Sequence, residues 1–195
     1  MQIAEREYGS IFTKREVVEA ILDLIKFSLK SFPVKSSILE PSFGEGSFLF
    51  PIIERVLDNY ACSGKDDGEI LTNLQDVIRA VEIQQDTFER VKLMVIELLK
   101  SKGFSLTLSK SLADKWLIND DYLLHNFEGK FDYIVGNPPY IRQEKVSQEK
   151  ISEYRKQFKT LYDRADIYVA FIEKSLQLLF QNCSRWQKLQ DKLKH

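Results

Sequence analysis

Apolar residues along the chain follow two patterns, the spacing of an amphipathic helix and short continuous runs. Phe88, Val91 and Val95 recur every three or four residues, which is typical of a helix that buries one face. The runs at 77–83 and 131–135 are short and apolar, which favours buried strands. Along the whole chain, the two patterns predict helix 14–31, strand 37–40, helix 47–59, strand 77–83, helix 85–101, strand 105–109, strand 131–135, helix 148–158 and helix 166–181.

Strands that alternate with helices predict an α/β fold, with a mostly parallel sheet covered by helices on both faces. The 195 residues, 44% of them hydrophobic, suffice for one substantial core, so a single domain is expected. The polar stretch 59–73 contains Gly64 and Gly68 and separates a predicted helix from a predicted strand. It is therefore interpreted as a surface insertion.

Charge and cysteine content exclude several classes of protein. The longest apolar runs are too short to span a membrane, and the charged N-terminus is unlike a secretory signal. Cys62 and Cys183 form neither a metal site nor a convincing disulfide pair, so a reducing cytoplasm is the expected setting. The net charge of −1 gives the whole chain no electrostatic attraction for DNA. A local DNA contact is the hypothesis for one basic group, which is interleaved with acidic residues: Arg142, Lys145, Lys150, Arg155, Lys156 and Lys159.

The turn Asn137-Pro138-Pro139-Tyr140, just beyond the apolar run 131–135, has the groups needed to hold a planar amine. The Asn137 side-chain oxygen and the Pro138 carbonyl can accept hydrogen bonds from the two N–H groups of such an amine, and the prolines preset the orientation of these acceptors. The Tyr140 ring can stack on a base taken out of its duplex. Taken alone, the turn is equally compatible with a proline-rich end to a buried strand.

A second turn, at positions 40–46, follows the predicted strand 37–40. Gly44 and Gly46 let the main chain approach a ligand at the carboxyl end of a strand, where open α/β sheets bind nucleotides. The third glycine of the dinucleotide fingerprint is absent, which argues against a pyrophosphate ligand. Glu82, near the end of the next strand, is placed to accept hydrogen bonds from two ribose hydroxyls, although it is also compatible with an ordinary solvated strand end.

In order and spacing, these motifs resemble the S-adenosylmethionine-dependent N6-adenine DNA methyltransferases of bacterial restriction–modification systems. The resemblance covers about residues 8–180 and implies a Rossmann-like methyltransferase sheet. It implies that Asn137, Pro138, Pro139 and Tyr140 form the catalytic turn. The cofactor-binding residues that it implies are Thr13, Glu40, Pro41, Gly44 and Gly46 around the methionine moiety, Glu82 at the ribose, and Asp121 and Tyr122 at the adenine, with Asp120 a competitor for Asp121.

The same resemblance implies S-adenosylmethionine as cofactor, no metal, and duplex DNA with a flipped adenine as substrate. Transfer of the methyl group would be direct, without a covalent enzyme intermediate. Two alternatives remain open: an inactive or subunit-only fragment of such an enzyme, or a methyltransferase that acts on RNA adenine or on protein glutamine.

The C-terminal part departs from the family pattern, because no glycine and no strand-like run follow Phe180. The C-terminal strands are therefore expected to be missing from a truncated chain. No segment suits a target-recognition domain, so a recognition subunit or a remaining domain is the expected partner. Within the single domain 1–195, the predicted parts are a cofactor-closing helix (1–32), a cofactor-binding and catalytic core (33–140) and a helical C-terminal part (141–195).

Overall fold

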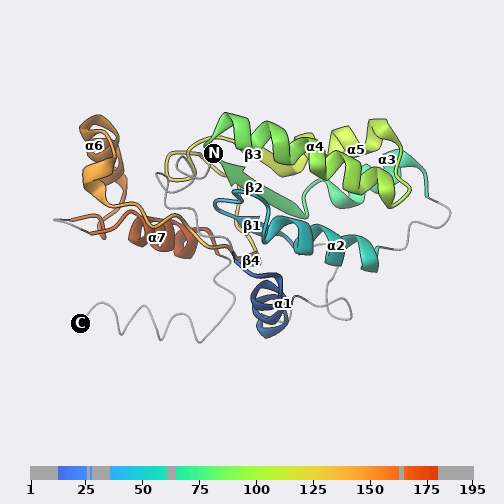
Figure 1. Ribbon diagram of the computed structural model, residues 1–195, viewed down its shortest axis with the longest axis horizontal. Coiled ribbons are helices and arrows are strands. Elements are labelled where there is room, and N and C mark those ends of the chain that lie inside the picture. The colour runs from blue at the N-terminus through green and yellow to red at the C-terminus, as the bar shows by residue number, and fades with distance from the viewer. Residues whose placement is uncertain (1–12, 26, 28–35, 61–64, 163–164, 180–195) are drawn as a thin grey trace.

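The computed structural model describes residues 13–25, 27, 36–60, 65–162 and 165–179. In this part of the chain, four strands form one parallel sheet in the order β3-β2-β1-β4. The strands are β1 (Ile38–Glu40), β2 (Ile78–Glu82), β3 (Leu117–Asn119) and β4 (Tyr133–Ile134). The helices are α1 (Arg15–Leu24), α2 (Leu49–Asn59), α3 (Asp67–Leu74), α4 (Gln85–Ser101), α5 (Leu106–Trp116), the short 3-10 helix η2 (Gln143–Lys145), α6 (Gln148–Gln157) and α7 (Tyr168–Leu178) (Figure 1).

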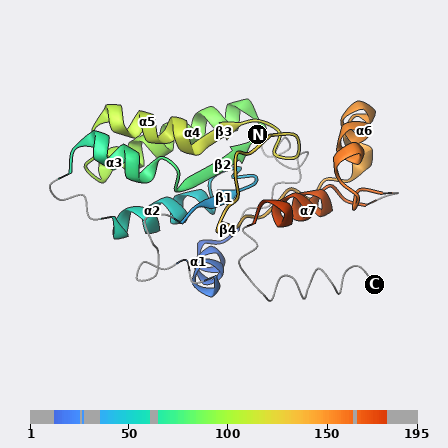
Figure 2. The same ribbon diagram turned by 180° about the vertical axis from the view of Figure 1, so that it is seen from behind.

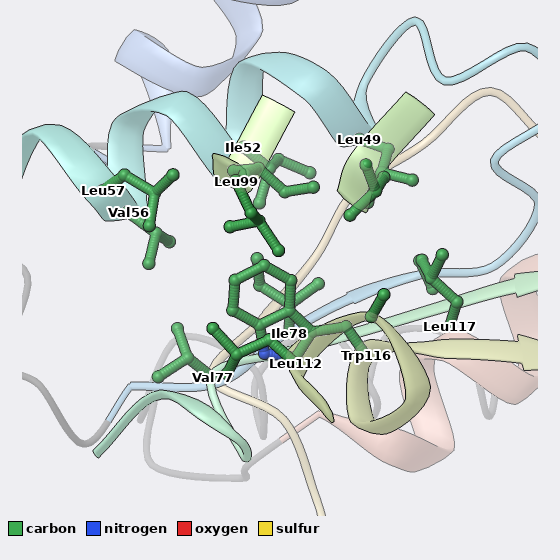
Figure 3. Close-up of a cluster of buried hydrophobic side chains, with 14 of the residues drawn as sticks. Leu49, Ile52, Val56, Leu57, Val77, Ile78, Leu99, Leu112, Trp116 and Leu117 are labelled. Carbon is green, nitrogen blue, oxygen red and sulfur yellow. The ribbon is translucent and has the colours of Figure 1, made fainter. Parts of the chain in front are cut away.

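The sheet separates two hydrophobic clusters because successive side chains of a strand point to opposite faces. Ile38 and Ala80 face a large cluster with residues of α1 to α5, which includes the buried Trp116 (Figure 3). Their neighbours Leu39 and Val81 face a second cluster with residues of α6 and α7. Helices thus cover both faces, as predicted, and α6 and α7 lie at one end of the molecule in both views (Figures 1 and 2).

The predicted strand 105–109 is wrong, because these residues begin helix α5. Ser105 caps the helix by accepting a hydrogen bond from the Leu108 amide at 3.1 Å. Leu108, Leu112 and Trp116 then recur every four residues and are buried on one face. The third strand is β3, which follows α5 directly.

The predicted insertion 59–73 is partly helical, because α3 occupies its second half. The side chain of Asp66 caps α3 by accepting from the Glu69 amide at 2.9 Å, and Ile70 and Leu74 are buried. Residues 61–64 lie outside the described residues. The insertion therefore contributes to the core.

The ends of the chain are described only in part. Helix α1 is anchored to α2 by Arg55, which pairs with Asp23 at 2.7 Å and donates to the Phe27 carbonyl at 2.8 Å. At the other end, Leu179 forms a single parallel bridge with Phe131, next to β4. The region 180–195, where strands were predicted to be missing, lies outside the described residues. None of the described helices is long and apolar enough to cross a membrane.

Candidate functional site

The predicted site residues gather at the carboxyl ends of neighbouring strands. Glu40 ends β1, Glu82 ends β2, and the turn at Asn137 follows β4. β4 lies on the opposite side of β1 from β2, so the chain order reverses at β1. Ligands of open α/β sheets bind outside the carboxyl ends of strands at such a reversal.

The glycine turn is held in a conformation that favours glycine. Gly44 and Gly46 have φ of 50° and 84°, in the left-handed region. A Cβ atom on Gly46 would lie 2.5 Å from Phe50 Cε2, so a side chain at this position would also collide with α2. The Gly46 amide donates to the Phe43 carbonyl at 2.7 Å, which closes the turn.

Glu82 fixes the glycine turn to β2. Its Oε2 accepts from the Gly44 amide at 3.0 Å and its Oε1 accepts from the Gln84 amide at 2.8 Å. Burial raises the pKa of Glu82, and these backbone hydrogen bonds counteract that rise. A carboxylate has about four acceptor positions, so Glu82 keeps acceptor capacity beside its backbone donors.

Glu40 is the buried charge that most needs a partner. Its side chain is 2% exposed, and its Oε2 has no hydrogen-bond partner among the described residues. Burial, and secondarily the charge of Glu82, raise the pKa of Glu40 well above its usual value. A buried carboxylate is costly unless a cation or a proton compensates it. The ammonium group of a bound methionine moiety would be such a cation, so these residues fit S-adenosylmethionine.

The turn after β4 contacts both the β1 loop and the N-terminal segment. Val135 donates to the Leu39 carbonyl at 3.0 Å, and a Cβ atom on Gly136 would lie 3.3 Å from Pro41 Cδ. The Asn137 side-chain nitrogen donates to the Thr13 hydroxyl at 3.3 Å. Three segments that lie far apart in the sequence, at Thr13, Glu40-Pro41 and Asn137, therefore meet here.

Tyr140 is available to a ligand. Its side chain is 53% exposed, and its ring centroid lies 5.9 Å from that of Tyr168 on α7. The carboxamide, the prolines and this ring follow one another along a single turn next to the glycine turn. The structure thus brings the predicted catalytic turn and the predicted methionine site together.

Asp121 and Tyr122, in the loop after β3, are more enclosed than the sequence suggests. The Asp121 carboxylate accepts hydrogen bonds from Tyr154 at 2.6 Å and Lys150 at 3.0 Å, both on α6. The Tyr122 ring is buried and stacks on Phe171 at 5.0 Å. Burial raises the pKa of Tyr122, and its hydroxyl lies 2.9 Å from Ser175 Oγ. Their roles as cofactor contacts stay predictions.

Asp120, the competitor for Asp121, has partners within its own loop. It accepts from the Asp121 amide at 2.7 Å and lies 2.7 Å from His125 Nδ1. The hydrogen bond with His125 lowers the pKa of Asp120. Its side chain is about half exposed, so it remains reachable by a ligand.

Lys174 on α7 is a site residue that the sequence analysis missed. Its ammonium donates to the carbonyls of Leu123 at 3.0 Å and His125 at 2.6 Å, and so clamps the loop after β3. Burial lowers the pKa of Lys174 to about 8. No local pattern marks this lysine, because its partners lie far away in the sequence.

The basic group that was predicted to contact DNA is partly used inside the protein. Lys150 pairs with Asp121, and Arg155 donates to Gln143 Oε1 at 2.8 Å. Arg142, Lys145, Lys156 and Lys159 are exposed. Among the residues that the structure covers, no cluster of His, Cys, Asp or Glu could hold a metal ion.

Comparison with solved structures identifies the fold. The chain superposes on a putative class I S-adenosylmethionine-dependent methyltransferase from Listeria monocytogenes with a TM-score of 0.51 and 13% identity, covering 92% of this chain and 45% of that one. The predicted fold class is therefore confirmed.

Curated relatives are type II methyltransferases. M.PaeR7I of Pseudomonas aeruginosa is 44% identical over 187 residues, which cover 92% of this chain and 32% of that protein. M.XhoI of Xanthomonas vasicola is 39% identical over 189 residues, with 93% and 35% covered. This chain thus spans about a third of the length of these relatives.

The family model described as Eco57I restriction-modification methylase matches residues 46–184, most of the chain. Membership of a methylase family indicates S-adenosylmethionine as the cofactor, as the sequence predicted. The chain belongs to the Eco57I restriction-modification methylase family.

Proposed function

We propose that this chain is the catalytic part of a site-specific DNA methyltransferase that transfers a methyl group from S-adenosylmethionine to the N6 amine of adenine in duplex DNA. The observation that carries the proposal is the close approach of two segments: the end of β1 at Glu40 and Pro41, where Glu40 Oε2 has no partner among the described residues, and the segment after β4 that leads into Asn137. Glu40, which can bind a cation, and the turn at Asn137, which can hold an amine, thus lie at the ends of adjacent strands. Membership of a restriction–modification family supports DNA as the substrate.

The cofactor is held by groups that the fold already orients. Glu40 would receive the ammonium group, and the backbone at Gly44 to Gly46 would lie against the methionine moiety together with Thr13 and Pro41. Glu82 would accept the ribose hydroxyls with acceptor positions that its backbone donors leave available. When bound, S-adenosylmethionine supplies an electrophilic methyl group on a positively charged sulfur.

The catalytic turn positions the amine nitrogen for in-line attack. The Asn137 side-chain oxygen and the Pro138 carbonyl accept hydrogen bonds from the two N–H groups of the adenine amine, which draws electron density toward its nitrogen. Pro139 keeps the turn rigid, and Tyr140 stacks on the extruded base. With S-adenosylmethionine bound, its sulfonium would supply the methyl group to the nitrogen that Asn137 and Pro138 hold. No residue of the chain becomes covalently attached to the substrate.

The hydrogen bond of 3.3 Å between the Asn137 carboxamide and the Thr13 hydroxyl ties the catalytic turn to the N-terminal segment. The turn is therefore held next to a residue that we place at the methionine moiety.

Recognition of a DNA sequence requires side chains in a groove, and we assign it to a partner subunit or to another domain. The setting that we propose is the cytoplasm, as the sequence analysis expects. Calorimetry with S-adenosylmethionine is the first test of the catalytic role, since a catalytic part must bind the cofactor.

Replacing Asn137 by alanine tests the proposed function. Tritiated methyl incorporation into duplex DNA should fall by about 10² to 10³-fold, the usual effect of losing one preorganised polar group at a reacting centre. Binding of S-adenosylmethionine should change less than about twofold, because Asn137 grips the substrate amine. Asn73→Ala is the matched control, since Asn73 is also partly buried and donates to Tyr60 Oη at 2.9 Å.

Turnover by Asn137→Ala at the wild-type rate would remove the catalytic assignment. If the wild-type protein methylates RNA or protein fractions and not DNA, the substrate is RNA adenine or protein glutamine. Digestion of methylated DNA to nucleosides identifies the modified base as N6-methyladenine or another product.

A further inference from the structure

The Asp121 carboxylate is almost fully engaged by the protein itself. Its Oδ2 accepts from Tyr154 Oη at 2.6 Å and from Lys150 Nζ at 3.0 Å, and its Oδ1 accepts from the Leu123 amide at 3.1 Å. The Asp121 side chain is 11% exposed. Both usual acceptor positions of Oδ2 and one of Oδ1 are thus occupied.

The two donors on α6 are a matched pair. Lys150 and Tyr154 are four residues apart, so they project from the same face of the helix. Ile151, Tyr154 and Phe158 are buried in the cluster behind the sheet, together with Leu123. A buried tyrosine hydroxyl needs a partner, and Asp121 provides one.

Asp121 is therefore a link between two parts of the proposed active site. The loop that carries Asp121 follows β3, next to Glu82, whose carbonyl accepts from the Asp120 amide at 3.2 Å. Helix α6 begins eight residues after Tyr140, the last residue of the catalytic turn. A carboxylate in the cofactor loop thus fixes the helix that follows the catalytic turn.

We propose that Asp121 is a positioning residue, which fastens α6 to the loop after β3 and so sets the shape of the cofactor site, rather than a ligand of the cofactor's adenine amine. This inference rests on the proposed function, because it concerns the cofactor site of that activity. The hydrogen bond from Tyr154 is the main element of the link, since Tyr154 is buried and its hydroxyl donates to a carboxylate at 2.6 Å. The pair with Lys150 is secondary because the lysine is partly exposed.

A double-mutant cycle with Asp121→Asn and Tyr154→Phe tests the link. Calorimetry compares S-adenosylmethionine with an analogue that lacks the 6-amino group, at a temperature where circular dichroism shows every variant folded. We expect each single variant to weaken both ligands by a similar factor, about tenfold. The double variant should be no weaker than the singles, because both changes act on the same contact: asparagine removes the charge of the acceptor and phenylalanine removes the donor. Tyr162→Phe, which removes an exposed phenol (73% exposed), is the matched control.

Direct recognition of the adenine amine predicts a different pattern. Asp121→Asn would then weaken only the ligand that has the 6-amino group, and Tyr154→Phe would leave both affinities unchanged. Either result, or additive losses in the double variant, overturns the positioning role.

A ligand-free readout separates this inference from the proposed function. Amide hydrogen exchange should become faster in residues 148–157 of Asp121→Asn and in residues 121–125 of Tyr154→Phe. Unchanged exchange in both variants overturns the link, whether or not the cofactor binds. If amide exchange becomes faster in both variants but the wild-type protein does not bind S-adenosylmethionine, the link stands and the proposed function fails.

Discussion

Replacement of Glu40 by glutamine should raise the stability of the ligand-free protein and weaken cofactor binding. Glutamine has nearly the shape of a protonated glutamate but cannot ionise. Because burial and Glu82 raise the pKa of Glu40, the folded state binds more protons than the unfolded state just above pH 4.5. The contribution of Glu40 to wild-type stability should therefore fall as the pH rises from 4.5 through the folded-state pKa of Glu40.

The size of the effect follows from proton linkage. One group changes the unfolding free energy by at most about 1.4 kcal/mol per pH unit, and each unit of pKa shift is worth about 1.4 kcal/mol in total. Since the pKa of Glu40 is raised well above its usual value, Glu40→Gln should be more stable than wild type by at least about 1 kcal/mol at pH 8. The two proteins should be almost equally stable below pH 4.5, where both side chains are neutral.

Urea unfolding at several values between pH 4.5 and 8 measures this difference directly. Glu82 remains in the variant and also has a raised pKa, so the pH dependence should become shallower without vanishing. Glu97→Gln is the control, because the Glu97 side chain is 69% exposed. Affinity for S-adenosylmethionine should fall by about 10- to 100-fold, as expected for the loss of a buried charged partner. Parallel pH profiles for wild type and Glu40→Gln would refute the reasoning.

Two further predictions concern the supports of the site. Lys174→Met should destabilise the protein by about 2 kcal/mol, since it leaves two carbonyls without their donor. The pKa of Lys174 is about 8 in the folded protein and 10.5 in the unfolded chain, so Lys174 should contribute increasing stability to the wild type as the pH rises between these values. Thermal denaturation of Lys174→Met should not show this increase. Gly46→Ala should destabilise more than Gly129→Ala and abolish cofactor binding, because both positions have similar positive φ but only Gly46 faces Phe50. Equal urea midpoints for the two alanine variants would contradict the predicted collision.

The parts of the fold that the sequence predicts are those that depend on local pattern. β1, β2 and β4 lie inside the predicted strands 37–40, 77–83 and 131–135. β1 and β2 are buried on both faces, which requires nearly continuous apolar residues. The glycine turn is equally local, since its positive φ values favour glycine. Residues 105–109 were misassigned because apolar and polar residues alternate there as in a strand. Only the extension to Leu112 and Trp116 reveals the helical repeat.

The candidate site likewise contains residues whose position the sequence predicts and residues whose partners it does not. Glu40, Glu82 and Asn137 could be predicted because each ends or follows a strand, and parallel strands bring their carboxyl ends to one edge. The partners of Asp121 and the role of Lys174 could not. They come from α6 and α7, which lie 29 to 51 positions further along the chain, and the sequence of a helix does not reveal which loop its side chains will meet.

The pairing of β1 with β4 has a consequence for the order of folding. The Ile38 amide donates a hydrogen bond to the Val77 carbonyl. The hydrogen bond from the Ser37 amide to the Asp132 carboxylate joins residues that are 95 positions apart. Closing the longer loop costs more entropy, so we expect β4 to dock after β1, β2 and β3 have paired. Pulse-labelled hydrogen exchange should then show the Val135 amide protected later than that of Ile38. Until β4 docks, one edge of β1 stays open to other chains, so aggregation during refolding should compete with the step that completes the catalytic site.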